Sequence, residues 1–151
     1  MTDSNDAAQL DGLAFLRAII DGRIPQPPMS KTLGFRLVSA EPGTAVFEGE
    51  TGEYLYNPMG TVHGGYFATL LDSALGCAVL TRLPAGVGYT TAQLNLNLLR
   101  PATAATGKLR ATGTALHIGR TLATSEARLV GIEDGKLYAH ATTTCAVYPA
   151  C

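Results

Sequence analysis

The 151-residue chain is long enough for one domain and leaves little room for a second. Its hydrophobic fraction of 46% and charged fraction of 15% predict a sizeable core, and the scarcity of charge indicates further burial against another subunit. A net charge of −1 without any block of like charges excludes nucleic acid and anionic membrane surfaces as main partners, and no apolar run reaches the ~20 residues that span a bilayer.

The N-terminal sequence MTDSNDAAQLDG is acidic and polar, unlike a secretory or transit signal. The three cysteines, Cys77, Cys145 and Cys151, lack the spacing of a metal site or a redox pair. We therefore expect free thiols, no metal and a soluble cytoplasmic protein.

Apolar spacing predicts an amphipathic helix over residues 7–21, and the proline-rich segment GRIPQPPMS after it breaks that pattern. We assign residues 1–31 to this helix and its lead-in, and residues 32–151 to a single main domain. The lead-in is expected to carry the chain from a peripheral helix onto the body of the protein.

Beyond Gly34 the hydrophobic period changes to two, which predicts two strands joined at the turn-forming tripeptide Glu41-Pro42-Gly43. The segment YFATLLDSALGCAVLTRL then predicts one long helix that is apolar around most of its circumference. TTAQLNLNLLR alternates strictly, which places Ala92, Leu94, Leu96 and Leu98 on one face of a further strand.

Three more strands follow, with hairpin turns at Gly119-Arg120 and Asp134-Gly135. A helix that is apolar on most sides needs cover on most sides, and a curved antiparallel sheet wrapped around it is the simplest cover. The sequence therefore predicts an α+β fold.

Asp72, in the middle of the long helix, is the only Asp, Glu, Lys or Arg between Glu53 and Arg82. It shares a helical face with small residues, which indicates close approach by a substrate or a second subunit. Partial burial would suit this carboxylate for use as a base. The alternative interpretation is a structural Asp that hydrogen-bonds nearby backbone.

Gly64 and Gly65 lie where the preceding loop becomes this helix. The first turn of a helix has free N–H groups and a dipole that favours negative charge, so the backbone here can hold a carbonyl oxygen that becomes an oxyanion. An ordinary glycine-rich turn is the alternative. Gly64 and Asp72 are eight residues apart, or ~12 Å along a helix axis, so both can act on one carbonyl only if they come from different chains.

The loop before the helix also contains Asn57 and His63. His63 either polarises a substrate carbonyl or is satisfied by backbone, and Asn57 either holds a water or braces the loop. Neither alternative is excluded by the sequence.

NPMGTVHGG, followed after six residues by Asp72, resembles the phenylacetic-acid-pathway (PaaI-like) group of hotdog thioesterases. The segments TTAQLNLNLLRPA, HIGRTLATSEARLV and DGKLYAHATTTCAVY are similar to later parts of that group in the same order. The resemblance covers roughly residues 32–148. It implies a hotdog fold, a long helix wrapped by an antiparallel sheet, in subunits that pair edge to edge and associate into tetramers.

The resemblance also implies hydrolysis of an acyl-CoA thioester to a free acid and CoA, without a cofactor. Asp72 matches the family's general base or nucleophile, and Gly64 matches the residue whose backbone N–H polarises the carbonyl. Asn57 and His63 match supporting loop positions, and Thr90 or Thr91 matches a hydroxyl that holds the water. The family draws Asp72 and the loop residues from different subunits.

We assign further residues to the substrate- and CoA-binding surface: Gly65, Thr91, Arg100, Gly119 and Arg120. The arginines, with Arg82, lie at element ends where they can meet CoA phosphates or simply be solvated. Two other functions compete: a non-catalytic acyl-CoA sensor that uses the same pocket, and an acyl-thioester dehydratase, whose paired His and acid occur in a different sequence setting.

Overall fold

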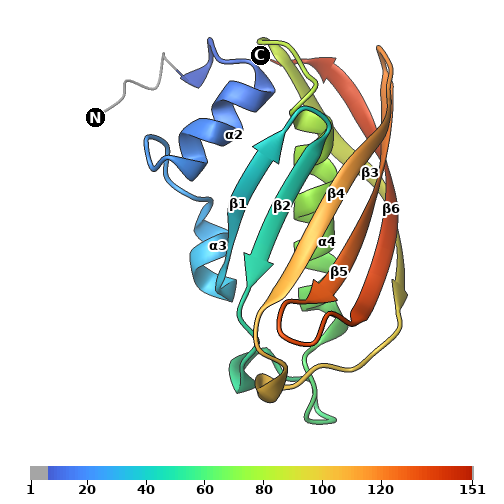
Figure 1. Ribbon diagram of the computed structural model, residues 1–151. Coiled ribbons are helices and arrows are strands. Elements are labelled where there is room, and N and C mark those ends of the chain that lie inside the picture. Colours follow the sequence, from blue (N-terminus) through green and yellow to red (C-terminus); the bar gives the residue numbers. More distant parts are fainter. Residues whose placement is uncertain (1–6, 151) are drawn as a thin grey trace.

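The computed structural model describes residues 7–150, which form one antiparallel sheet curved around a central helix, with two short helices on one side (Figure 1). The strands are β1 (Phe35–Glu41), β2 (Thr44–Gly49), β3 (Val87–Leu98), β4 (Leu109–Ile118), β5 (Leu122–Gly131) and β6 (Leu137–Pro149). The helices are α2 (Gly12–Ile20), α3 (Pro28–Leu33) and α4 (Gly64–Leu80), with 3-10 turns η1 (Glu53–Leu55) and η2 (Ala104–Thr106). The predicted α+β hotdog architecture is confirmed.

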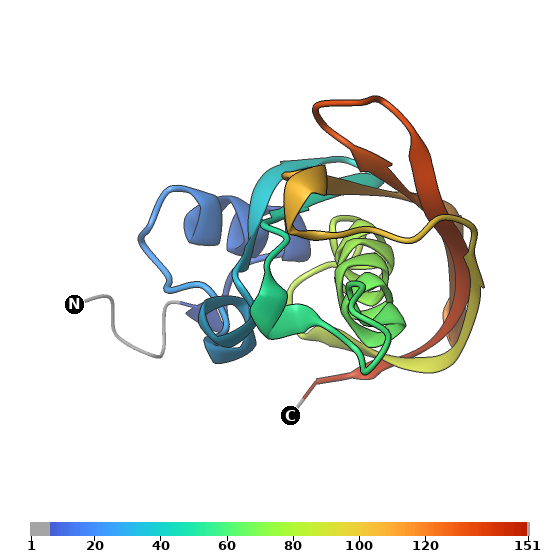
Figure 2. The same ribbon diagram turned by 90° about the horizontal axis from the view of Figure 1, so that it is seen from below.

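The six strands are ordered β1-β2-β4-β5-β6-β3, so β3 lies at one edge of the sheet, beside β6 and away from its chain neighbour β4. The sheet wraps α4 and leaves it open on one side, as the view along the helix shows (Figure 2). The predicted turn at Glu41-Pro42-Gly43 is confirmed, with Gly43 at φ 82°. The two later hairpins also pair as expected.

The predicted long helix is α4, whose buried side chains form the centre of the core. These residues are Tyr66, Phe67, Leu70, Leu71, Ala74, Leu75, Gly76, Ala78 and Val79. The helix lies very close to the sheet at Gly113 of β4, where a Cβ would collide with the backbone of Ala74. Ser125 of β5 donates a hydrogen bond of 2.9 Å to the Leu75 carbonyl and fixes the contact.

The N-terminal region differs from the expectation of one helix over residues 7–21. The helix α2 begins at Gly12 because Asp11 caps it, its carboxylate accepting from the Ala14 N–H at 2.8 Å. A second helix, α3, occupies the segment predicted only as a breaker. Its proline at the first helical turn is compatible with helix, because the missing N–H has no intrahelical partner there. This helix spans the expected boundary at residue 31.

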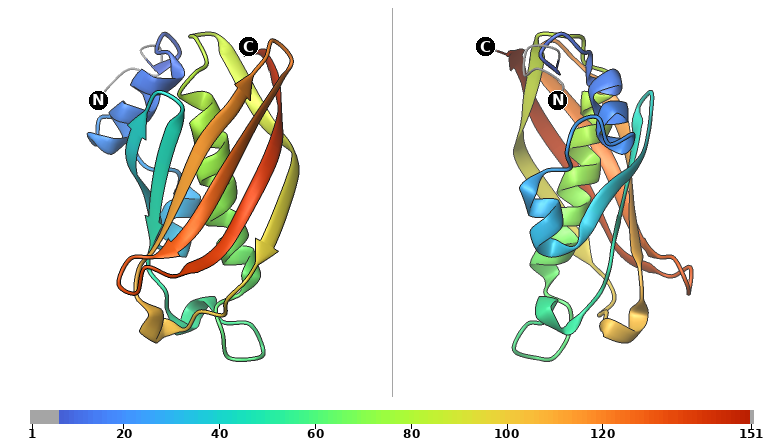
Figure 3. Two further views of the ribbon diagram at one scale, coloured as in Figure 1. Left: turned by 45° about the vertical axis from the view of Figure 1, so that its right-hand side comes forward. Right: turned by 90° about the vertical axis from the view of Figure 1, so that its left-hand side faces the viewer.

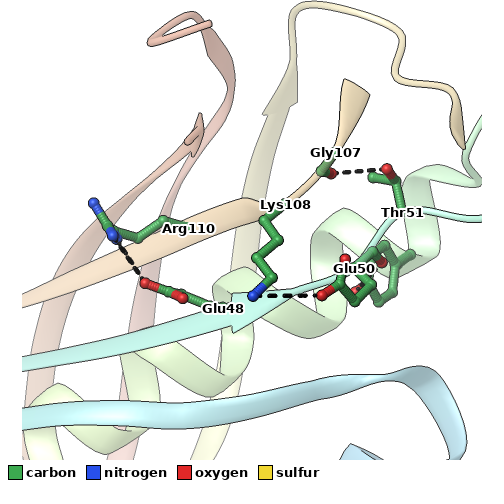
Figure 4. Close-up of polar contacts among 7 residues, drawn as sticks. Glu48, Glu50, Thr51, Gly107, Lys108 and Arg110 are labelled. Atoms are coloured by element: carbon green, nitrogen blue, oxygen red, sulfur yellow. Dashed lines mark hydrogen bonds and ion pairs between the residues drawn. The ribbon is translucent and has the colours of Figure 1, made fainter. Parts of the chain in front are cut away.

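Ion pairs and a hydrogen bond join β2 and the chain after it to β4 on the surface (Figure 4). Arg110 pairs with Glu48 at 2.9 Å and Lys108 with Glu50 at 3.5 Å, while Thr51 donates to the Gly107 carbonyl at 2.7 Å. Exposed pairs of this kind contribute ~0–1 kcal/mol each, so they align the strands more than they stabilise them.

Candidate active site

Asp72 lies midway along α4 and is half-buried. The Thr91 hydroxyl of β3 donates a hydrogen bond of 3.0 Å to the Asp72 Oδ1 atom. A β-bulge at Ala92 makes this contact possible, because the register with β6 skips from Thr91 to Gln93. Thr91 therefore faces α4.

The same bulge corrects the strict alternation expected for this strand. Ala92 is exposed and does not share the inward face of Leu94 and Leu96, which pack against the core. Of the two threonines considered for one role, Thr91 contacts the carboxylate, and Thr90 is exposed.

A pocket of about 220 Å³ surrounds Asp72. Its walls come from the segment around α3, from β1 and β2, from α4 and from β3, and the lining residues are Pro27, Met29, Ser30, Phe35, Phe47, Asp72, Ser73, Cys77, Tyr89 and Thr91. Most of this lining is apolar. The Asp72 pocket is therefore suited to a hydrocarbon group held next to one carboxylate.

Among the described residues that line this pocket, Asp72 is the only Asp, Glu, Lys, Arg or His. Burial raises the pKa of the Cys77 thiol to about 12, against a lowering by a hydrogen bond with Tyr89, and the Asp72 charge raises it further. Burial likewise raises the pKa of the Tyr89 hydroxyl, with smaller contributions from nearby thiols and from Asp72. Both groups are protonated and neutral beside the carboxylate.

At the N-terminal end of α4, His63 is the N-cap, and its Nδ1 atom accepts a hydrogen bond from the Gly65 N–H at 2.8 Å. This hydrogen bond agrees with one of the two interpretations that the sequence left open for His63, in which the side chain is satisfied by backbone. Within residues 7–150 no hydrogen bond from the Gly64 N–H is found. A Cβ at Gly64 would stand 2.6 Å from the Leu98 Cδ1 atom, so glycine lets helix and strand approach here.

Asn57 braces the loop that precedes the helix. Its Oδ1 accepts from the Met59 N–H at 2.9 Å and from the Thr61 N–H at 3.3 Å, and its Nδ2 donates to the Thr61 hydroxyl at 3.0 Å. These hydrogen bonds fix the conformation of the loop that leads into the start of α4.

A second pocket, of about 240 Å³, lies at this end of the helix. Its lining residues are Asn57, Val62, Gly64, Phe67, Leu98, Leu99, Arg100 and Pro101. None of them lines the Asp72 pocket. One chain thus presents two separate pockets along the same helix, whose residues Gly64 and Asp72 are ~12 Å apart along the helix axis for eight residues.

The remaining predicted site residues lie around these two pockets or away from them. The Arg100 guanidinium sits over the Tyr138 ring, 6.0 Å from its centroid, at the edge of the second pocket. Gly119 and Arg120 form the β4–β5 turn and line neither pocket.

Two of the three cysteines and most of the N-terminal segment fall within the described part of the chain. Cys77 and Cys145 are free thiols, as expected, whereas Cys151 and residues 1–6 lie outside the described residues. The helices within the described range are too short or too polar to cross a membrane.

Sequence reasoning missed Tyr89 and Cys77, which line the Asp72 pocket. A signal for Tyr89 was present, because it lies two residues before Thr91 and so shares its strand face. The small-residue face of α4 was expected to admit a substrate or a second subunit. At Gly76 the approaching group is instead the Tyr89 hydroxyl, 2.6 Å from where a Cβ would stand.

The antiparallel sheet curved around one long helix defines a hotdog protein, and comparisons with known proteins give its family. The sequence model of the thioesterase superfamily matches residues 59–138, just over half of the chain. The chain is 32% identical to acyl-coenzyme A thioesterase 13 of Homo sapiens, over 85% of this chain and 91% of that protein. It is 29% identical to 1,4-dihydroxy-2-naphthoyl-CoA hydrolase of Listeria monocytogenes, over 79% of this chain and 94% of the relative.

Solved structures agree. A phenylacetic acid degradation-related protein of Ralstonia eutropha JMP134 matches with a TM-score of 0.77 and 32% identity, over 87% of this chain and 98% of that one. A variant of the phenylacetic acid degradation protein PaaI of Thermus thermophilus matches with a TM-score of 0.71 and 30% identity, over 80% and 98% of the two chains. The chain belongs to the thioesterase superfamily and is a PaaI-like hotdog thioesterase.

Proposed function

We propose that this thioesterase hydrolyses acyl-CoA thioesters at a site composed of two half-sites from two subunits. The observation that carries the proposal is the split of the reactive groups: Asp72 lies in one pocket and the Gly64 N–H borders another on the same helix. The names of relatives, which are acyl-CoA thioesterases and an aroyl-CoA hydrolase, support CoA thioesters as the substrate class.

The thioester carbonyl would lie between the Gly64 N–H of one subunit and Asp72 of the other. The N–H stabilises the negative charge that develops on the carbonyl oxygen. Asp72 accepts a proton from a water, whose oxygen attacks the carbonyl carbon. The C–S bond then breaks, CoA leaves as a thiol after taking up that proton, and the acid is released.

A direct attack by the Asp72 carboxylate is the variant of this chemistry. It gives a transient anhydride, which water then opens. In either case Thr91 orients Asp72 through the 3.0 Å hydrogen bond to its Oδ1. Asn57 and His63 hold the loop and helix start that present the Gly64 N–H. Neither route needs a metal or redox cofactor.

The free edge of β3 offers the means of joining two subunits. Among residues 7–150, this 12-residue strand pairs with β6 on one side only, and Leu98 and Leu99 at its end are about half exposed. An unpaired strand edge is a template for another strand, and an identical chain can add its own β3 in antiparallel orientation about a two-fold axis.

The half-sites themselves specify the register of this pairing. Gly64 lies against Leu98, and Asp72 is bonded to Thr91, so Leu98 must stand opposite the partner's Thr91. Counted from Asn95 along the strand, Leu98 lies three paired positions away in one direction. Thr91 lies three paired positions away in the other direction, because the bulge residue Ala92 is skipped. The two-fold axis therefore passes through Asn95. A further association of such dimers into tetramers leaves this edge pairing intact.

The test is hydrolysis of a panel of aryl- and alkyl-CoA thioesters, with released thiol measured. We expect turnover by the unsubstituted protein and a loss of roughly 10²- to 10⁴-fold in kcat for Asp72→Asn, the usual worth of a general base. Asp21→Asn, on the exposed C-cap of α2, is the matched control and should retain full activity. Turnover by Asp72→Asn equal to that of the control would refute the role of Asp72.

A mixing experiment tests the shared site. Gly64→Pro removes the N–H at a first helical position, where the helix backbone accepts proline. The added Cβ displaces only the Cδ1 end of the half-exposed Leu98 side chain. Mixed dimers of Asp72→Asn and Gly64→Pro chains contain one intact pair of half-sites, so they should regain up to half of the activity of an unsubstituted dimer. No recovery after proven subunit exchange would contradict the shared site. Binding of CoA thioesters without thiol release by the unsubstituted protein would identify a ligand sensor instead.

A further inference from the structure

The helix α3 forms one wall of the Asp72 pocket, although it belongs to the N-terminal lead-in outside the matched family region. It packs beside β1, at the side where α4 is not covered by the sheet (Figure 3). Its N-terminal residues contribute Pro27, Met29 and Ser30 to the pocket. A segment that precedes residues 59–138, the range that the family model matches, thus bounds the space next to the carboxylate.

The pocket is built for a hydrocarbon of limited size. Beyond Asp72 and Thr91 its large side chains include Met29, Phe35 and Phe47. A volume of about 220 Å³ lies below the ~300–1,000 Å³ of typical small-molecule pockets. An acyl group that enters from Asp72 would therefore be limited in length by the pocket walls.

The walls differ in how firmly they are held. Phe35 and Phe47 are only 6% and 4% exposed and pack ring against ring with centroids 6.0 Å apart, so they cannot move without opening the core. Ser30 is 3% exposed, whereas Met29 beside it is 52% exposed. Met29 therefore stands where the pocket wall meets solvent, with an unbranched and adaptable side chain.

We propose that Met29 determines the acyl-length limit of this enzyme by forming the part of the Asp72 pocket wall that meets solvent. The inference rests on the proposed function, because it takes the acyl group to occupy this pocket during hydrolysis. With Met29 in place, a chain longer than the pocket meets the thioether. Without that side chain, additional carbons pass α3 toward solvent.

The experiment measures kcat/KM for straight-chain acyl-CoA thioesters from four to fourteen carbons. Each methylene that becomes buried is expected to raise kcat/KM about fourfold until the wall is reached. Met29→Ala should move the optimum to longer chains by about two to three carbons, the length of the side chain removed. Met29→Trp should lower the ratio of kcat/KM for eight carbons to kcat/KM for four carbons at least tenfold. Leu116→Ala, an exposed apolar residue on β4, is the control and should keep the original profile.

The outcomes separate the two proposals. Hydrolysis by the unsubstituted protein with the same length profile in both Met29 variants would overturn the role of Met29 and leave the proposed function standing. Absence of thiol release from every acyl-CoA by the unsubstituted protein would overturn both. Met29→Trp keeps the inference falsifiable if Met29→Ala does not fold, because it adds volume at a half-exposed position.

Discussion

The Asn95→Cys substitution tests the β3 pairing at its centre. If the two-fold axis passes through residue 95, the two copies of this residue stand directly opposite each other with Cα atoms about 4.5 to 5.5 Å apart. That distance lies inside the range of a disulfide, which is about 4.4 to 6.8 Å. Mild oxidation should therefore link the subunits, and a non-reducing gel should show nearly all of the protein as a covalent dimer.

Asn97→Cys is the matched control, because Asn97 is an exposed asparagine on the same strand. The two copies of this residue are four residue steps apart along the joined strands, or about 14 Å at ~3.4 Å per residue. No disulfide forms over that distance. Equal cross-linking of both variants, or of neither while the protein is dimeric, would refute the proposed register.

Two further predictions concern groups that border the Asp72 pocket. The Ser30 hydroxyl is buried without a hydrogen-bond partner among the described residues, so Ser30→Ala should leave the free energy of unfolding unchanged or raise it by ~1 kcal/mol, whereas Ser125→Ala, which loses a bond, should lower it by ~1 kcal/mol. Urea unfolding compares them, and equal losses would contradict the reasoning. The raised pKa of Cys77, about 12 against an ordinary 9.0, means that the folded protein binds this proton more tightly than the unfolded chain. The contribution of this bound proton to the free energy of unfolding is complete below pH 9 and is lost as the pH rises toward 12. The fall in the free energy of unfolding over this pH range should therefore be smaller in Cys77→Ala than in the unsubstituted protein. Equal falls would show that Cys77 does not link stability to pH.

Much of the fold follows from local patterns in the sequence. The long apolar stretch with its i, i+3, i+4 spacing can only be a helix covered on most sides, and it is α4. The turn residues at Glu41-Pro42-Gly43 and Asp134-Gly135 divide period-two segments into hairpins, because glycine at these points accepts a positive φ. The isolation of Asp72 in that helix is likewise visible in the sequence alone.

The need for two chains in the proposed shared site also follows from the sequence. Eight residues of helix have a fixed length of ~12 Å, so Gly64 and Asp72 cannot meet within one chain. The structure adds that each lines its own pocket. The prediction of a shared site needs only helix geometry and the assignment of both residues to one helix.

Only the tertiary structure decided which threonine contacts Asp72. Alternation assumes an unbroken ladder, whereas the bulge at Ala92 depends on how β3 meets β6, a strand about 40 residues away in sequence. The helix α3 was not predicted from the sequence for a similar reason. Its prolines indicate a break in a helix, whereas its stability comes from packing against the rest of the protein. Sequence determined which residues are reactive and on which elements they lie. The pairing of distant strands determined which side chains face them, because side-chain direction in a sheet depends on a register that no local pattern contains.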